Sequence, residues 1–238
     1  DYHENGRADI FPELTLAERR KICRILDTDM LSDIFEHIDQ KQAAEYLDEM
    51  DVKKAAAILS AMETDAVVDV LKMTSKEKRS LLTELLDDDA KKDIAVIAAF
   101  DEDEIGSWMT TNCIVIRENL TVKQAMSSLV EQAAKNDNIS TIFMVTEDQT
   151  FYGAMDLKDL IIARQDSALE DLIVTSYPYV YGHELIDDCI EKLKDYSEDS
   201  IPVLNNNNKL LGVITSQSIV DLVDDEMGED YAKFAGLT

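Results

Sequence analysis

The chain has 238 residues, of which 45% are apolar and only 7 are Gly and 3 are Pro, a composition typical of a folded protein rather than a linker or a disordered region. Its 50 acidic and 23 basic residues give a net charge of −27, which disfavours nucleic acid and anionic lipid surfaces as partners. The three cysteines (Cys23, Cys113 and Cys189) are widely spaced and odd in number, which argues against a disulfide framework and for a reducing compartment.

No apolar run approaches the ~18 residues that a membrane span needs. The sequence begins without Met and without a signal-peptide pattern, which predicts that it is a piece of a longer protein. The acidic charge has two interpretations, a well-solvated surface or a surface that holds divalent cations through carboxylate oxygens. Charge alone does not decide between them.

From Leu16 to Phe100 the apolar residues follow helical periodicity. One helical stripe is formed by Met30, Leu31, Ile34, Phe35 and Ile38, and Leu81, Leu82, Leu85 and Leu86 repeat the pattern. An apolar residue followed by an acid also recurs, at Leu26-Asp27, Ile38-Asp39, Met50-Asp51, Met62-Glu63, Leu86-Asp87 and Phe100-Asp101, and the first four pairs are 12 residues apart. An acid suits the first residue of a helix, because it accepts free N–H groups. We therefore expect an all-α superhelical bundle of short helices.

The stretch 101–107 breaks this periodicity, and strands then alternate with helices. Strands are expected at 114–116, 142–145, 152–155, 179–181, 201–204 and 211–214, and helices at 122–132, 157–164, 186–195 and 216–223. The stretch from Gly153 is similar to the stretch from Gly212, which indicates a unit of 59 residues that occurs twice. The pattern predicts an α/β domain with pseudo-twofold symmetry, in which the Asn205–Asn208 run forms a hairpin turn.

Two groups of acids share a helix face. Asp65 and Asp69 are four residues apart, and Asp221, Asp225 and Glu229 follow at the same spacing. Like charges at this spacing destabilise a helix unless something neutralises them. A bound cation would do so, whereas the alternative is a plain solvated helix face.

The chain lacks a recognisable catalytic constellation. The histidines (His3, His37 and His183) are scattered, and no Gly-rich phosphate loop is present. We therefore expect a binding or regulatory module rather than an enzyme. Each cysteine is expected to be a small core residue.

Each 59-residue unit resembles a cystathionine-β-synthase (CBS) repeat, with an entry such as Trp108-Met109-Thr110, a strand such as Ile201-Pro202-Val203 and a Gly-x-x-Thr/Ser-x-x-Asp turn. The wider order of short-helix repeats, a CBS pair and the acidic tail 229–236 resembles the cytosolic region of MgtE-type magnesium channels. The resemblance implies an N domain over 1–104, a CBS pair over 105–223 (repeats at about 109–168 and 172–223) and the start of a connecting helix over 224–238.

The resemblance also implies a function: a cytosolic Mg²⁺ sensor that closes the pore of a magnesium channel when Mg²⁺ bridges acidic domain interfaces. It implies a transmembrane pore domain in the same full-length chain, a place at the cytoplasmic face of the membrane, and a homodimer formed through the CBS pair, with helices 122–132 and 186–195 as candidate contacts. The implied metal ligands are Asp65, Asp69, Asp187, Asp221, Glu226, Glu229 and Asp230.

An alternative is an adenosine-nucleotide sensor that acts on another partner. Asp159 is at the position where CBS modules bind a ribose, and Lys158 could meet a phosphate. However, Asp156 replaces the hydroxyl residue that would approach the phosphates, and Thr141 replaces an aromatic residue that could stack on adenine. ATP is therefore a weaker expectation than Mg²⁺.

Overall fold

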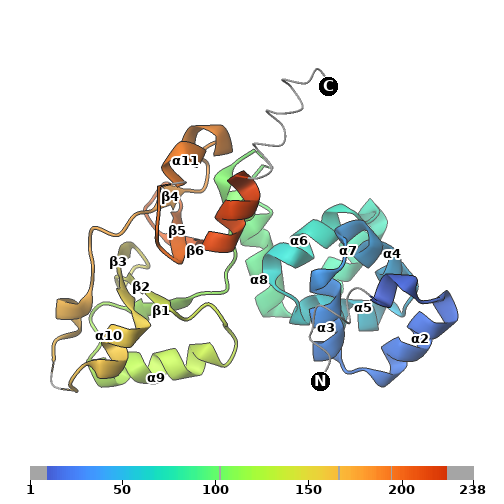
Figure 1. Cartoon of the computed structure of the whole chain (residues 1–238), viewed down its shortest axis with the longest axis horizontal. Helices are drawn as coiled ribbons and strands as arrows, with labels where there is room; N and C mark the ends of the chain where they lie inside the picture. The colour runs from blue at the N-terminus through green and yellow to red at the C-terminus, as the bar shows by residue number, and fades with distance from the viewer. Residues whose placement is uncertain (1–9, 102, 166, 194, 224–238) are drawn as a thin grey trace. The chain divides into compact units, whose positions relative to one another are not determined.

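The computed structural model describes residues 10–101, 103–165, 167–193 and 195–223. The chain divides into two compact units, residues 1–98 and residues 99–238 (Figure 1). The connecting helix expected over 224–238 lies outside the described residues.

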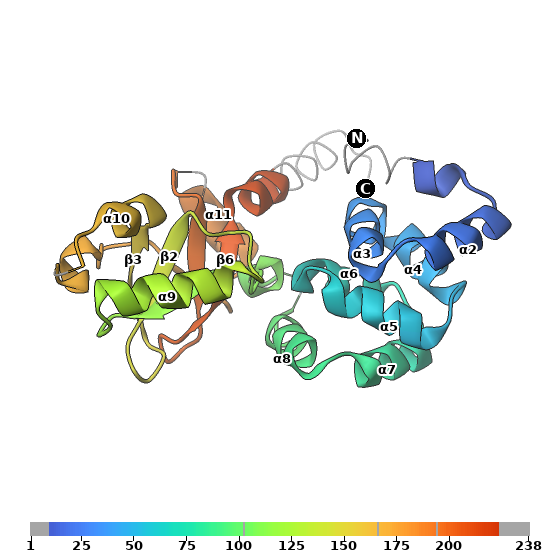
Figure 2. The same ribbon diagram turned by 90° about the horizontal axis from the view of Figure 1, so that it is seen from below.

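The first unit is built from short helices joined by tight turns. After a 3₁₀ turn, η1 (Phe11–Glu13), come α2 (Leu16–Ile25), α3 (Thr28–His37), α4 (Gln40–Asp48), α5 (Val52–Ala61), α6 (Thr64–Lys72), α7 (Lys76–Leu85) and α8 (Asp88–Ile97). The main packing partner of a helix is the helix two places further along: α3 packs on α5, α4 on α6, α5 on α7 and α6 on α8 (Figure 2). This confirms the expected superhelical stack.

The helix starts in this unit recur every 12 residues. The N-cap residues of α2 to α8 are Thr15, Asp27, Asp39, Asp51, Glu63, Ser75 and Asp87. All except Glu63 accept a hydrogen bond from a backbone N–H in the first turn of their own helix. All of the acids that the sequence pattern singled out, except Asp101, are these caps, and Thr15 and Ser75 continue the series with hydroxyl groups.

The apolar stripes bury one face of each helix. Leu31, Leu47, Ile58, Leu59 and Leu82 are fully buried and form part of the core. The stripe on α7 is narrower than its leucines suggest, because Leu81 and Leu85 are 45% and 40% exposed.

The second unit contains two three-stranded sheets of the same topology. In the first, β1 (Ile114–Arg117) pairs in parallel with β2 (Thr141–Val145), which pairs antiparallel with β3 (Phe151–Asp156). In the second, β4 (Val180–Tyr181) pairs in parallel with β5 (Ser200–Leu204), which pairs antiparallel with β6 (Leu210–Thr215). The helices of this unit are α9 (Val122–Ala133), α10 (Leu157–Ile162), α11 (Ile186–Leu193) and a helical run over 216–223, with 3₁₀ turns η2 (Ile105–Trp108) and η3 (Leu169–Leu172).

The two sheets repeat each other in detail. The register shifts at Met144/Val145 in the first sheet and at Val203/Leu204 in the second. The hairpin turns place Gln149 and Asn208 at positive φ (68° and 61°), and these two residues are 59 positions apart. The pseudo-twofold repeat that the sequence predicts is therefore present in the backbone itself.

The segment that precedes each repeat crosses to the sheet of the other repeat. Thr110 bridges Val213 on β6, and Val174 bridges Ala154 on β3. A Cβ atom on Gly153 would lie 2.6 Å from the carbonyl oxygen of Val174, and one on Gly212 would lie 2.5 Å from that of Thr110. The repeated glycine is needed because the backbone of the crossing segment passes directly over it.

The first sheet lies between two apolar layers. Its Ile114, Ile142 and Met155 pack with residues of α9 and α10 on one face, where Leu129 and Leu160 are buried. The alternate residues of these strands, including Phe143 and Ala154, point to the opposite face and pack against Val213 of the other sheet. All three cysteines are buried, and none of them forms a disulfide in the described part of the chain, as the sequence predicts.

Candidate functional site

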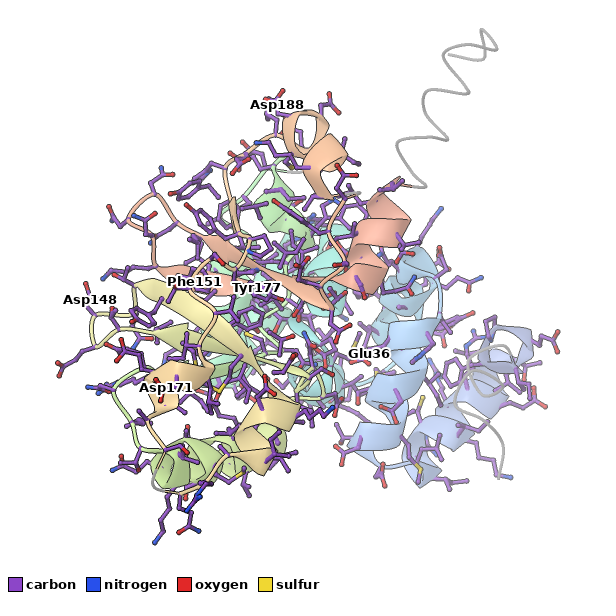
Figure 3. All side chains as sticks on the ribbon, turned by 60° about the vertical axis from the view of Figure 1, so that its left-hand side comes forward. Glu36, Asp148, Phe151, Asp171, Tyr177 and Asp188 are labelled. Atoms are coloured by element: carbon purple, nitrogen blue, oxygen red, sulfur yellow. The ribbon has the colours of Figure 1, made fainter. Side chains whose placement is uncertain are left out.

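The N-terminus of α6 departs from the regular capping series. The Glu63 side chain makes no capping bond within its helix. Instead, the Glu63 N–H donates to Oε1 of Glu36, 2.6 Å away, which is supplied by α3 (Figure 3). Asp65 lies in the first turn of the same helix. The carboxyl groups of Glu36 and Asp65, which come from different helices, therefore both lie at the N-terminus of α6.

Both carboxyl groups are poorly solvated. Burial raises the pKa of Asp65, although the backbone N–H groups of Asp65 and Ala66 oppose the shift. Burial also raises the pKa of Glu36, and repulsion from Asp33 and Asp65 acts in the same direction. The positive end of the α6 dipole and the Glu63 N–H offset only part of this cost. A positive charge here would stabilise the ionised pair.

Asp69 lies one helical turn after Asp65, and its surroundings differ from the expectation of an uncompensated charge. Its Oδ2 accepts a hydrogen bond of 3.0 Å from Gln40 Nε2, and its Oδ1 is 3.8 Å from Nζ of Lys72. The sequence prediction overlooked this lysine, which follows at i+3 on the same helix face. Such an exposed pair contributes little to stability.

The other expected metal ligands are placed singly where the structure describes them. Asp187 is exposed in the first turn of α11. Asp221 is exposed, and its Oδ1 accepts a 2.9 Å hydrogen bond from Gln217. Glu226, Glu229 and Asp230 lie outside the described residues. Among the residues that are described, no group of three or more His, Cys, Asp or Glu side chains is arranged to hold a metal ion.

The chemistry of Glu36 and Asp65 nevertheless fits Mg²⁺. Mg²⁺ prefers hard oxygen ligands, keeps several of its waters and commonly contacts only one or two carboxylates. A pair of partly buried carboxylates with raised pKa values offers such oxygens and gains from neutralisation. The residues that would hold the ion in this unit are Glu36 and Asp65, with Asp69 adjacent.

A second candidate is a cleft of about 240 Å³ in the second unit. It lies where β2, β3 and the segment before β4 meet the loop before β5, and Thr141, Asp156, Tyr177, Glu198 and Asp199 contribute to its lining. The Tyr177 hydroxyl donates to the carbonyl oxygen of Ser200 at 2.9 Å (Figure 3). Burial raises the pKa of Tyr177 to about 12, and the neighbouring carboxylates act in the same direction. The tyrosine is therefore a neutral hydrogen-bond donor at physiological pH.

The acidic lining of this cleft does not favour a polyphosphate. Three carboxylates line it, and the described part of its lining contains no Lys or Arg. One oxygen of Glu198 is buried without a hydrogen-bond partner. The expected nucleotide ligands, Asp159 and Lys158, lie on α10 and are not part of the lining. The fit to a nucleoside triphosphate is therefore poor.

Two of these residues carried no signal that the sequence could have shown. Glu36 is separated from Glu63 by 27 residues, and only the packing of α3 near α6 brings them together. Glu198 lies in an acidic loop whose neighbours are set by the crossing of Val174 over β3. The helical spacing of Asp65 and Asp69, in contrast, placed their carboxylates on one face, although only the family resemblance implied a metal there.

Comparison with known families divides the chain in a similar way to its fold. Residues 2–103 match the model of the MgtE intracellular N domain. Residues 104–166 and 169–225 each match the CBS domain.

The chain is similar over its length to magnesium transporters. It is 29% identical over 240 residues to the magnesium transporter MgtE of Thermus thermophilus, covering 100% of this chain and 53% of that protein. It is 25% identical over 228 residues to the magnesium transporter MgtE of Bacillus subtilis, covering 96% and 51%. The chain thus spans about half the length of these curated relatives.

Two solved structures are similar to the whole fold. One is the crystal structure of the soluble part of a magnesium transporter, with a TM-score of 0.87, 28% identity and coverage of 94% of this chain and 89% of that one. The other is the cytosolic domain of the Mg²⁺ channel MgtE in complex with ATP, with a TM-score of 0.84, 24% identity and coverage of 93% and 91%. None of the helices in the described part of the chain is both long and apolar enough to cross a membrane.

Proposed function

We propose that this chain, which belongs to the CBS-domain family and is homologous to MgtE magnesium transporters, is the Mg²⁺-sensing regulatory part of such a transporter. The observation that carries the proposal is the pair of partly buried, poorly neutralised carboxyls at the N-terminus of α6. In this proposal the chain has no catalytic step, and it acts at the cytoplasmic face of the membrane, connected to a pore domain of the same full-length chain.

The chemical basis of the sensor is repulsion between carboxylates. At low Mg²⁺, Glu36 and Asp65 repel each other, and the net charge of −27 opposes compaction of the chain as a whole. Neutralisation of these acids would favour a more compact population, because a ligand shifts an equilibrium toward the state that binds it better. We propose that Asp69, Asp187, Asp221, Glu226, Glu229 and Asp230 also bind cations, which close the pore when Mg²⁺ is abundant.

We propose a homodimer formed through the second unit. α9 packs on α10, and together they expose Val130, Ile161 and Ile162, which are 66%, 60% and 69% exposed. Exposed apolar side chains on two helices that pack together suit an isologous interface between two copies. The α9 and α10 surface supports this more than α11, whose Cys189, Ile190 and Leu193 are buried.

The alternative is a nucleotide sensor, and it rests on the cleft beside Tyr177 and on the ATP complex of a structural relative. The carboxylates of Asp156, Glu198 and Asp199 weigh against it.

Separate titrations with MgCl₂ and ATP distinguish the two functions. Because a ligand that binds only the folded, compact state raises the melting temperature by mass action, millimolar MgCl₂ should raise it on its own. NaCl at matched ionic strength controls for simple screening of the acids. A response to ATP without Mg²⁺, together with no response to MgCl₂ beyond that of NaCl, would favour the nucleotide sensor instead.

A further inference from the structure

The first unit contains a basic cleft, although the chain is strongly acidic. The cleft has a volume of about 290 Å³ and lies against α2, α4 and the start of α5. Arg19, Arg20, Arg24 and Lys54 all contribute to its lining, in a chain that has only 23 Lys and Arg residues against 50 acids. Four basic side chains gathered in one cleft of a strongly acidic chain need a local explanation.

Two of these cations are explained by the fold. Arg19 pairs with Glu49, with Nη2 at 2.6 Å from Oε1, and its guanidinium lies 4.4 Å from the centre of the Tyr46 ring. Nζ of Lys54 donates a hydrogen bond to the backbone carbonyl oxygen of Cys23. These contacts tie α2 to α4 and α5, so Arg19 and Lys54 also hold the walls of the cleft in place.

Arg20 and Arg24 have no such role. Both are exposed, and neither has an ion-pair or hydrogen-bond partner among the described residues. They are four residues apart on α2 and so share a face, where two like charges are mildly destabilising. The dipole of α2 favours a cation in its last turn and accounts for Arg24, but Arg20 lies earlier in the helix.

The acids in the lining do not neutralise this surplus. Glu49 is engaged with Arg19. Oδ1 of Asp51 accepts the N–H groups of Lys53 and Lys54 as the cap of α5. The cleft therefore presents guanidinium groups whose planar fork matches the oxygens of a phosphate or a carboxylate.

The volume of the cleft and its apolar lining indicate what the part of the ligand beyond the anionic group is. Phe11, Tyr46 and Met50 lie beside the cations. A cavity of about 150 Å³ suffices for a benzene-sized group, so this cleft has room for a small apolar body and a charged head. Pockets for organic ligands combine apolar walls with a few placed polar groups in the same manner.

We propose that this cleft binds a small organic anion, a phosphate or carboxylate on an apolar body, with Arg20 and Arg24 holding the anionic head. The ligand differs from Mg²⁺ in charge, and the cleft does not include Glu36, Asp65 or Asp69. The site is therefore independent of the proposed cation sites.

The test is isothermal titration calorimetry of the whole chain with phenyl phosphate, benzoate and inorganic phosphate, at constant ionic strength and without Mg²⁺. The double variant Arg20→Gln, Arg24→Gln should bind the preferred aromatic anion about tenfold or more weakly, as expected for the loss of charge-assisted hydrogen bonds. The matched control Arg117→Gln, Lys123→Gln removes the same charge from exposed positions in the second unit and should bind like the parent chain.

Saturable binding of phenyl phosphate or benzoate that depends on Arg20 and Arg24 supports the proposal, and the better of the two probes identifies the head group. Binding of neither probe overturns it, as does equal binding by the Arg20→Gln, Arg24→Gln variant. Inorganic phosphate that binds as tightly as phenyl phosphate would overturn the assignment of an apolar body. The melting temperature of each variant without ligand verifies that it is folded.

Discussion

Among single residues, the acids at the α6 N-terminus combine a structural role with a proposed role in binding Mg²⁺. The Glu36 carboxylate caps a helix that its own N-cap residue leaves uncapped, and this is an ordinary structural role. The same burial that positions Glu36 and Asp65 makes their ionised forms costly. Under the proposed function, a bound cation would remove part of this cost, which it could not do at a fully solvated cap.

The raised pKa values predict a specific pH dependence. The folded chain holds protons on Glu36 and Asp65 more tightly than the unfolded chain does, so their contribution to stability is present below their ordinary pKa and is lost as pH rises through the raised pKa. The variant Glu36→Gln, Asp65→Asn has no titratable group at either position, so it cannot lose this contribution to stability as pH rises. In buffer with a chelator, its melting temperature should fall less than that of the parent chain as pH rises from about 4, the ordinary pKa of these acids, toward neutrality.

Glu45→Gln serves as the control, since Glu45 is exposed on α4 and its loss changes the charge without relieving burial. A double variant that follows the pH profile of the parent chain would contradict the account of these two acids.

Residue spacing explains which of these residues the sequence could reveal. Asp65 and Asp69 stand out because i and i+4 share a helix face, and Lys72 could have been recognised as a partner by the same rule. Glu36 could not, because no local pattern relates it to a helix start 27 residues later. The acidic lining of the second cleft was only partly foreseen, through Asp156.

At the scale of elements, two periods organise the chain. The caps recur every 12 residues, which is one short helix and its turn, and the pattern of apolar and acidic pairs already indicated this unit. The strands and helices of the second unit repeat after 59 residues, and most of their bounds differ from the sequence expectation by one or two positions. The exchange of segments between the repeats was not predictable, because a single bridge between a segment and the sheet of the other repeat leaves no local pattern in the sequence.

The repeated glycine is where the crossing segment approaches the sheet most closely, and a substitution there tests whether glycine is required. In Gly153→Ala the new Cβ would lie 2.6 Å from the Val174 carbonyl oxygen, so the crossing segment must move. We expect a loss of about 1–3 kcal/mol in the free energy of unfolding of the second unit, as for other overpacked sites. Chemical denaturation measures it. Ser127→Ala, on the exposed face of α9, should change stability by less than about 0.5 kcal/mol. If both variants unfold like the parent chain, the crossing does not constrain Gly153.

At the scale of the whole molecule, association is expected through the second unit. Ile161 and Ile162 on α10 are 60% and 69% exposed, and a standard interface of about 1,600 Å² in total would cover them. Ile161→Glu, Ile162→Glu should convert a dimer to a monomer, because two buried charges without partners oppose association. Sedimentation velocity gives the stoichiometry.

The matched control for this variant is Leu81→Glu, Leu85→Glu, which changes two exposed leucines of the first unit. It should remain dimeric. A parent chain that sediments as a monomer at tens of micromolar, with or without Mg²⁺, would argue against the dimer.

If Mg²⁺ acts by neutralising carboxylates that oppose compaction, the whole chain should contract as MgCl₂ is added, and small-angle scattering measures this contraction. The radius of gyration should decrease with MgCl₂ and change less with NaCl at matched ionic strength. Asp65→Asn, Asp69→Asn should be compact at lower Mg²⁺ if repulsion dominates, or should lose its response if coordination dominates. Equal effects of the two salts on the parent chain, or an unchanged titration of the variant, would contradict this role of Mg²⁺.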